Sequence, residues 1–163
     1  MDRRGQLSKV LDCMSKELYR FLAREMNIRR PSEPIRPGQQ QDYLDFEINF
    51  FEALVAESPD FLDALIPLAE AYTQKGLHKK GLGVDEKIVR LRPKDPVGYY
   101  NLACSYSLLE RTPDALAALE KALALGYSDR VHLRRDADLE NIRKDPRYRA
   151  LLARFSGPRL SCS

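Results

Sequence analysis

The chain has 163 residues, of which 44% are hydrophobic and 31% charged, and its formal net charge at pH 7 is +3. This length and composition predict one small domain with flanking segments, and the modest net charge argues against a general polyanion-binding protein. No apolar run reaches the length of a membrane span, and acidic residues interrupt the N-terminal basic ones, so we expect no membrane span, no signal or transit peptide, and a cytoplasmic location.

Residues 6–27 form the first predicted helix, because apolar residues recur in it at spacings of three and four. They are Leu7, Leu11, Met14, Leu18, Phe21, Leu22 and Met26. Three prolines between residues 31 and 37 then exclude a helix, so residues 1–40 are predicted to be an amphipathic helix plus a Pro-rich linker. An apolar stripe of this size is expected to pack against another surface and not to face water. We favour a cap on the following domain. The alternatives are a homodimer contact, an external partner, or a membrane surface, the last disfavoured because acidic residues dilute its positive charge.

A repeat of 34 residues organises the centre of the chain. Residues 42–57 predict an aromatic-rich helix that ends at Pro59, and helices follow at 61–75, 79–91, 96–109 and 113–125. Shifting the chain by the 34 residues between Pro59 and Pro93 places Leu68, Ala69 and Tyr72 on Leu102, Ala103 and Tyr106. A period of this size is typical of helical solenoids, in which each helix pair buries its apolar face by stacking on the next.

These residues resemble the tetratricopeptide repeat (TPR), whose first helix carries a bulky residue, then Leu, a small residue and Tyr. The motifs are Leu65-x-x-Leu68-Ala69-x-x-Tyr72 and Tyr99-x-x-Leu102-Ala103-x-x-Tyr106. The resemblance implies an all-α fold, a short right-handed α-solenoid of stacked antiparallel helix pairs with full repeats at about 62–95 and 96–129. In the second helices, Leu119 fits the pattern, but Asp85 stands where a bulky apolar residue is expected. Asp85 therefore either finds a polar partner or leaves its layer loosely packed.

Shorter helices are predicted after Gly126, where Tyr127 replaces the proline of the next repeat. One should hold Leu133, another should begin near Asp138, and a last one should start at Pro146 and cap the C-terminal end of the solenoid. The TPR-like domain is thus predicted to span residues 41–156, followed by a disordered tail at 157–163.

The family resemblance also implies a binding site, because the first helices of TPR proteins line a concave groove that holds peptides. The predicted groove residues are Asp63, Ile66, Glu70, Thr73, Gln74, Tyr100, Asn101, Cys104 and Ser107. Tyr100 would serve as an aromatic platform and Asn101 as a hydrogen-bonding group, although a merely solvated surface fits these residues equally well. Acidic residues in the set favour a neutral or basic ligand, unlike the Lys, Arg and Asn set that clamps the acidic tails of chaperones.

Catalytic, metal and nucleic-acid sites find little support in the sequence. It contains two histidines, His78 and His132, and no Gly-rich phosphate loop. Asp136, Asp138 and Glu140 alternate like cation ligands, but the glycine of a calcium loop is missing, so we predict no metal and no cofactor. The three cysteines lie far apart and indicate reduced thiols. Basic residues are scattered, which argues against nucleic-acid binding.

Together these features predict a non-enzymatic adaptor or scaffold that binds a peptide or segment of another protein in the groove of a TPR array. A structural self-assembly module, dimerising through residues 6–27, is the alternative.

Overall fold

The structure is a computed structural model that describes the backbone of residues 40–155 and the side chains from Leu44 onward. The predicted helix at 6–27, the Pro-rich linker and the tail at 157–163 lie outside these residues. Contacts divide the chain after Gln40, and the following description concerns the second unit, Gln41–Ser163.

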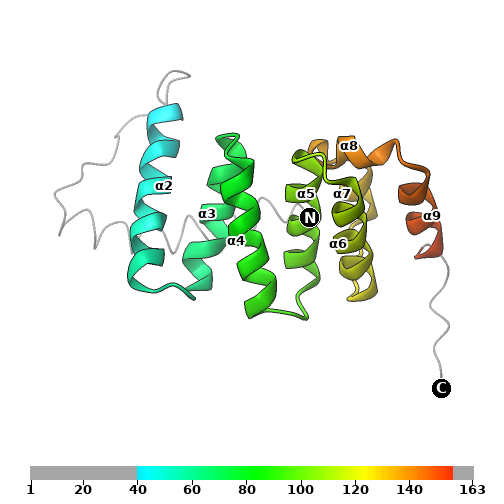
Figure 1. The fold of residues 1–163 in the computed structure, drawn as a ribbon, viewed down its shortest axis with the longest axis horizontal. Coiled ribbons are helices and arrows are strands. Elements are labelled where there is room, and N and C mark those ends of the chain that lie inside the picture. Colours follow the sequence, from blue (N-terminus) through cyan, green and yellow to red (C-terminus); the bar gives the residue numbers. More distant parts are fainter. Residues whose placement is uncertain (1–39, 156–163) are drawn as a thin grey trace. The chain divides into compact units, whose positions relative to one another are not determined.

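All regular structure among the described residues is helical, as the sequence predicts (Figure 1). The elements are α2 (Gln40–Glu57), α3 (Leu62–Gln74), α4 (His78–Leu91), α5 (Pro96–Leu108), α6 (Thr112–Ala124), α7 (Arg130–Arg135), the 3₁₀ helix η1 (Ala137–Leu139), α8 (Glu140–Arg143) and α9 (Pro146–Arg154). From α3 to α6, each helix packs against the next one along the chain. Within residues 40–155, no helix is long and apolar enough to cross a membrane.

Capping residues and turns define the helix ends. Asp95 accepts a hydrogen bond from the Val97 backbone N–H at 2.9 Å, and Asp145 accepts one from Arg147 N–H at 2.8 Å. In both cases proline is the first helical residue, where its missing N–H costs nothing. The turn between α3 and α4 uses Gly76 at φ +76°, a left-handed conformation that suits glycine.

The core consists of small and aliphatic residues at the helix crossings. Ala64, Ala103 and Ala115 are fully buried and allow the helix backbones to approach each other, while Leu65 and Leu119 fill the space beside them. One apolar cluster joins α2 to α3, a second joins α3 to α4, and the largest extends from α4 to α9. Successive layers are therefore connected by shared apolar contacts.

A hydrogen bond between a tyrosine and a glutamate recurs at the 34-residue spacing of the sequence. The Tyr106 hydroxyl on α5 donates to Glu86 Oε1 on α4 at 2.9 Å, and the Tyr72 hydroxyl on α3 donates to Glu52 Oε1 on α2. Each residue of the first pair lies 34 positions after its counterpart in the second. The same hydrogen bond thus links α2 to α3 and α4 to α5, as expected if α2 is the second helix of an incomplete repeat.

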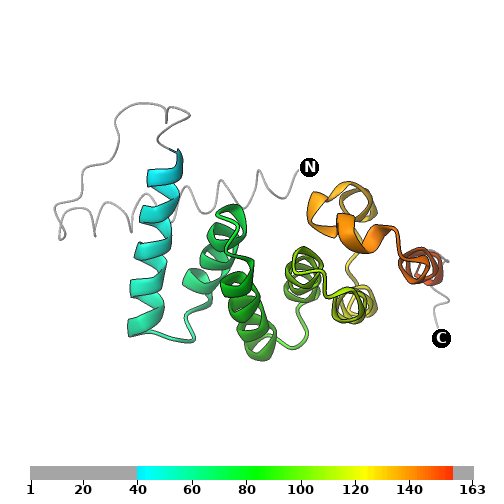
Figure 2. The same cartoon turned by 45° about the horizontal axis from the view of Figure 1, so that its top comes forward.

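The short helices after α6 fold back on the last full helix pair (Figure 2). Asn141 Nδ2 donates to the Ser107 carbonyl oxygen of α5 at 2.8 Å, and the Tyr148 hydroxyl of α9 donates to the Leu133 carbonyl oxygen of α7 at 2.7 Å. Leu133, Leu139 and Ile142 of this segment are fully buried. We call residues 127–143 the C-terminal cover.

Candidate functional site

The α3 part of the predicted groove is accessible. Asp63, Glu70 and Gln74 are exposed, and Ile66 and Thr73 are half-buried. Gln74 Nε2 lies 3.4 Å from Glu70 Oε1, and Thr73 Oγ1 donates to the carbonyl oxygen of Ala69 at 3.1 Å. This face therefore combines two exposed carboxylates with one partly accessible aliphatic side chain.

The α5 part of the predicted groove is largely covered, contrary to the expectation from the sequence. Tyr100 is 4% exposed, Cys104 8% and Ser107 0%, whereas Asn101 remains exposed. The expectation that Tyr100 offers its ring to a ligand is wrong in this structure. The physical reason is that the C-terminal cover of the same chain packs on α5 and occupies this surface.

Two aromatic contacts hold the cover against Tyr100. The Tyr127 ring stacks on the Tyr100 ring, with centroids 4.3 Å apart and ring planes within 2° of parallel. The His132 ring lies at a centroid distance of 5.5 Å, tilted by 46°. Side chains of the cover therefore make the ring contacts that the sequence assigned to a ligand.

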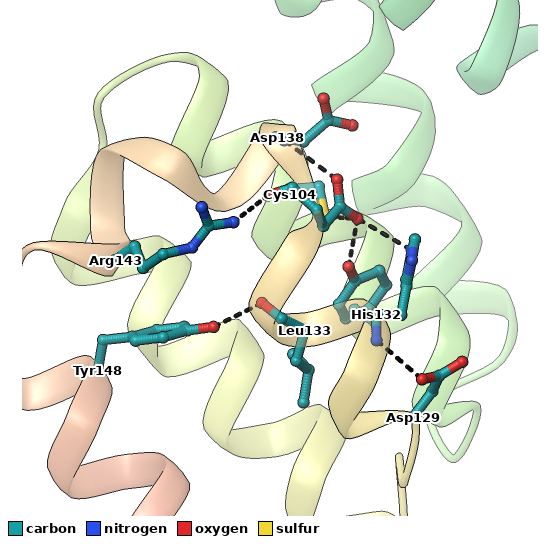
Figure 3. A network of polar contacts seen from close by, with 9 residues as sticks. Cys104, Asp129, His132, Leu133, Asp138, Arg143 and Tyr148 are labelled. Atoms are coloured by element: carbon teal, nitrogen blue, oxygen red, sulfur yellow. Dashed lines mark hydrogen bonds and ion pairs between the residues drawn. The ribbon is translucent and has the colours of Figure 1, made fainter.

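A buried carboxylate, Asp136, anchors the cover. Its partners His132, Asp138 and Arg143 are labelled in Figure 3. Its Oδ2 accepts a hydrogen bond from the Tyr100 hydroxyl and lies 3.0 Å from His132 Nε2. Its Oδ1 accepts from the Asp138 backbone N–H at 3.1 Å, and its carbonyl oxygen accepts from Arg143. Buried carboxylates require such donors because an unpaired charge in the interior is costly.

Burial keeps the phenols and the thiol beside Asp136 in their neutral forms. Desolvation is the main cause that raises the pKa of Tyr100, Tyr127 and Cys104, and the nearby Asp136 carboxylate raises all three further. Cys104 Sγ is 3.9 Å from Asp136 Oδ2, a long contact for a thiol donor. An unassisted nucleophilic role for Cys104 has no support in this environment.

The charge distribution distinguishes the accessible α3 region from the rest of the unit. Residues 40–74 contain eight Asp and Glu side chains and no Lys, Arg or His. Three of the acidic residues in this range are paired with lysines of the following segment. These pairs are Asp45–Lys75, Glu52–Lys80 and Asp60–Lys87. No described residue forms an ion pair with Asp63 or Glu70, so their charges face solvent.

Sequence reasoning missed Tyr127, His132 and Asp136 as partners of the predicted groove. A signal for Asp136 was present, because it lies one period after Leu102 and thus puts a carboxylate where the repeat has a buried leucine. The helix does break there: α7 ends at Arg135, and Asp136 has extended backbone angles. The stacking of Tyr127 on Tyr100 had no comparable signal.

Two known proteins are similar to this chain. The chain is 30% identical over 156 residues to a protein of Arabidopsis thaliana whose name describes it as chloroplastic, an alignment that covers 94% of this chain and 43% of that protein. It is 31% identical over 98 residues to the "Peroxisomal targeting signal receptor" of Pichia angusta, covering 60% of this chain and 17% of that protein. The chain thus spans less than half the length of either relative. No protein-family model matches the chain, and no solved structure matches it at a significant level.

Proposed function

We propose that this unit is a TPR-like right-handed helical solenoid that acts as a non-enzymatic adaptor, binding a segment of another protein along α3. The recurrence of the Tyr–Glu hydrogen bond at a spacing of 34 residues supports the repeat architecture. By its name, one similar protein is a receptor for a targeting signal, which is consistent with recognition of a protein segment.

The accessible α3 face carries the proposal. Asp63 and Glu70 present negative charge that no described residue pairs with, and Ile66 supplies apolar surface between them. Such a combination suits a short segment with Lys or Arg flanking an apolar residue, since charge complementarity steers encounter while the apolar contact adds affinity. Asn101 on α5 also stays exposed. Because the cover occupies the rest of α5, the available groove is shorter than the sequence predicts.

The proposal is tested with a display library of short peptides, selected on the full chain at low and at high salt. The expected result is enrichment of cationic peptides that weakens with salt, and loss of binding in an Asp63→Asn/Glu70→Gln variant. Asp114→Asn is the matched control, because Asp114 is a carboxylate on α6, outside α3, that pairs with Arg111. Enrichment without charge preference, or equal binding by the variant and the wild-type chain, would contradict the proposal.

The self-assembly alternative depends on residues 6–27, which lie outside the described residues. Light scattering separates the two functions: a dimer mass that falls to the monomer value on deletion of residues 1–40 would favour self-assembly. The cytoplasmic location inferred from the sequence stays a prediction.

A further inference from the structure

The fold brings three potential metal ligands together at the contact between α5 and the cover. Donor atoms of Cys104, Asp136 and Asp138 all lie within 4.8 Å of one another, and Cys104 and Asp136 are buried. In the sequence the two aspartates alternate with Glu140, a pattern that by itself predicts no metal. In the structure Glu140 instead lies exposed beside Arg143, and a thiol from 32 residues earlier takes the third place. We propose that Cys104, Asp136 and Asp138 bind a divalent transition metal ion, with Zn²⁺ the best fit.

The distance between Cys104 and Asp136 suits a shared ion. Zn–S bonds near 2.3 Å and Zn–O bonds near 2.1 Å at a tetrahedral angle place sulfur and oxygen about 3.6 Å apart. Cys104 Sγ and Asp136 Oδ2 are 3.9 Å apart. This distance is long for a hydrogen bond from a thiol. It is close to the sulfur–oxygen distance expected for two ligands of the same ion. The Asp138 carboxylate lies within 4.8 Å of both, so it would have to move closer to complete the geometry.

The donor types select the metal. A thiolate with two carboxylates combines a soft ligand with hard ones, a set that suits a borderline ion such as Zn²⁺ and disfavours Ca²⁺ or Mg²⁺, which prefer oxygen ligands alone. Three protein ligands leave a fourth position for water. Metal binding would also release the thiol proton of Cys104, because thiolate is the form that binds.

Groups around the cluster orient the carboxylate. His132 Nε2 lies 3.0 Å from Asp136 Oδ2, and the Tyr100 hydroxyl donates to the same oxygen. Hydrogen-bonded neighbours of this kind fix metal-ligating carboxylates in many sites. Here the ion would connect α5 to the cover, since Cys104 belongs to one and both aspartates to the other (Figure 3).

Cobalt titration tests the site directly, because a thiolate bound to Co²⁺ produces a charge-transfer absorption in the near ultraviolet. The parent is the full chain with Cys13→Ser and Cys162→Ser, in which Cys104 is the remaining thiol. We expect an absorption that saturates at one equivalent of Co²⁺ and disappears when Zn²⁺ is added. Zn²⁺ displaces Co²⁺ because it binds such sites more tightly.

Single substitutions in this parent assign the ligands. Cys104→Ser should abolish the absorption, Asp138→Asn should weaken Co²⁺ binding at least tenfold, and Asp114→Asn should leave it unchanged. Absence of the absorption in the parent would overturn the proposal whether or not the variants fold. Unchanged affinity in Asp138→Asn, with circular dichroism showing a native helical content, would overturn the three-ligand assignment.

Discussion

The Ser105 hydroxyl on α5 donates to Asp85 Oδ2 on α4 at 2.5 Å, and both side chains are buried in the core. This pair answers the question raised by Asp85 in the sequence, because the carboxylate finds a polar partner. One period earlier the equivalent residues are Phe51 and Ala71, and one period later they are Leu119 and Leu139, apolar in both cases. A buried hydrogen bond thus replaces an apolar contact in one layer of the stack.

Asp85 should make stability depend on pH. Burial raises the pKa of Asp85 from 3.8 to about 6, despite the opposing hydrogen bond from Ser105. The folded chain therefore binds a proton more tightly than the unfolded chain. Protonation of Asp85 therefore contributes to the stability of the fold. This contribution is fully present below the unfolded pKa and is lost as pH rises through about 6. For a pKa shift of this size it amounts to about 3 kcal/mol.

Asp85→Asn should remove this dependence, because the amide is neutral at every pH and its oxygen can still accept from Ser105. We expect the free energy of unfolding to rise by about 1–3 kcal/mol at pH 8 and to stay nearly unchanged at pH 4. Urea unfolding of both proteins between pH 4 and 8 measures the difference. The pKa assignment would be wrong if the two curves ran parallel over this range.

Much of the helical repeat could be predicted because its determinants are local and recur. The Leu, Ala and Tyr positions near Leu68 and Leu102 define buried faces at helical spacing, and the prolines and glycines mark the turns. Gly76 closes the turn between α3 and α4 at φ +76°, as expected of a glycine in this place. The helices from 42 to 125 consequently match their predicted positions to within a few residues.

The buried part of the site could not be predicted because it depends on contacts between distant segments. The repeat pattern assigns Tyr100 to an open groove, and nothing local to Tyr100 indicates that residues 127–143 will cover it. Ser107 illustrates the same difficulty. The sequence assigns Ser107 to the groove, but it is fully buried and Asn141 donates a hydrogen bond to its carbonyl oxygen.

Ala103→Leu should destabilise the unit by overpacking. Ala103 is fully buried in the cluster that joins α4 to α9, so three added carbon atoms must displace neighbours at a cost of about 1–3 kcal/mol. Asn101→Leu is the matched control on the same helix, because Asn101 is exposed and should change stability by about 0.5 kcal/mol or less. Thermal unfolding followed by circular dichroism compares the two. Similar losses in both variants would show that α5 does not pack in this orientation.

Asp136→Ala should loosen the C-terminal cover. It removes the acceptor of the Tyr100 hydroxyl and the partner of His132, and leaves a buried phenol without a hydrogen bond. A stranded buried donor costs about 1–3 kcal/mol. Hydrogen exchange measured with a chelator present should show faster exchange in residues 130–143, with little change in α3.

The hydrogen-exchange experiment includes a chelator and a control variant. Chelation removes any contribution from bound metal, so the difference reports the hydrogen bonds alone. Asp114→Asn again serves as the control for loss of one carboxylate from an exposed position. Equal rates of amide hydrogen exchange in residues 130–143 of the Asp136→Ala and Asp114→Asn variants would show that Asp136 does not anchor the cover.

Glu110→Gly should stabilise the unit. Glu110 closes the turn between α5 and α6 at φ +58° and lies one period after Gly76, so the same left-handed position is filled by glycine in one repeat and glutamate in the next. A side chain with a Cβ is strained in this region, and its removal should raise the free energy of unfolding by about 0.5–1 kcal/mol. The reverse change, Gly76→Ala, should lower it by a similar amount, since an added Cβ would meet no atom within 4 Å and only backbone strain remains. Equal stability of Glu110→Gly and the wild-type chain in urea would show that the turn adapts without strain.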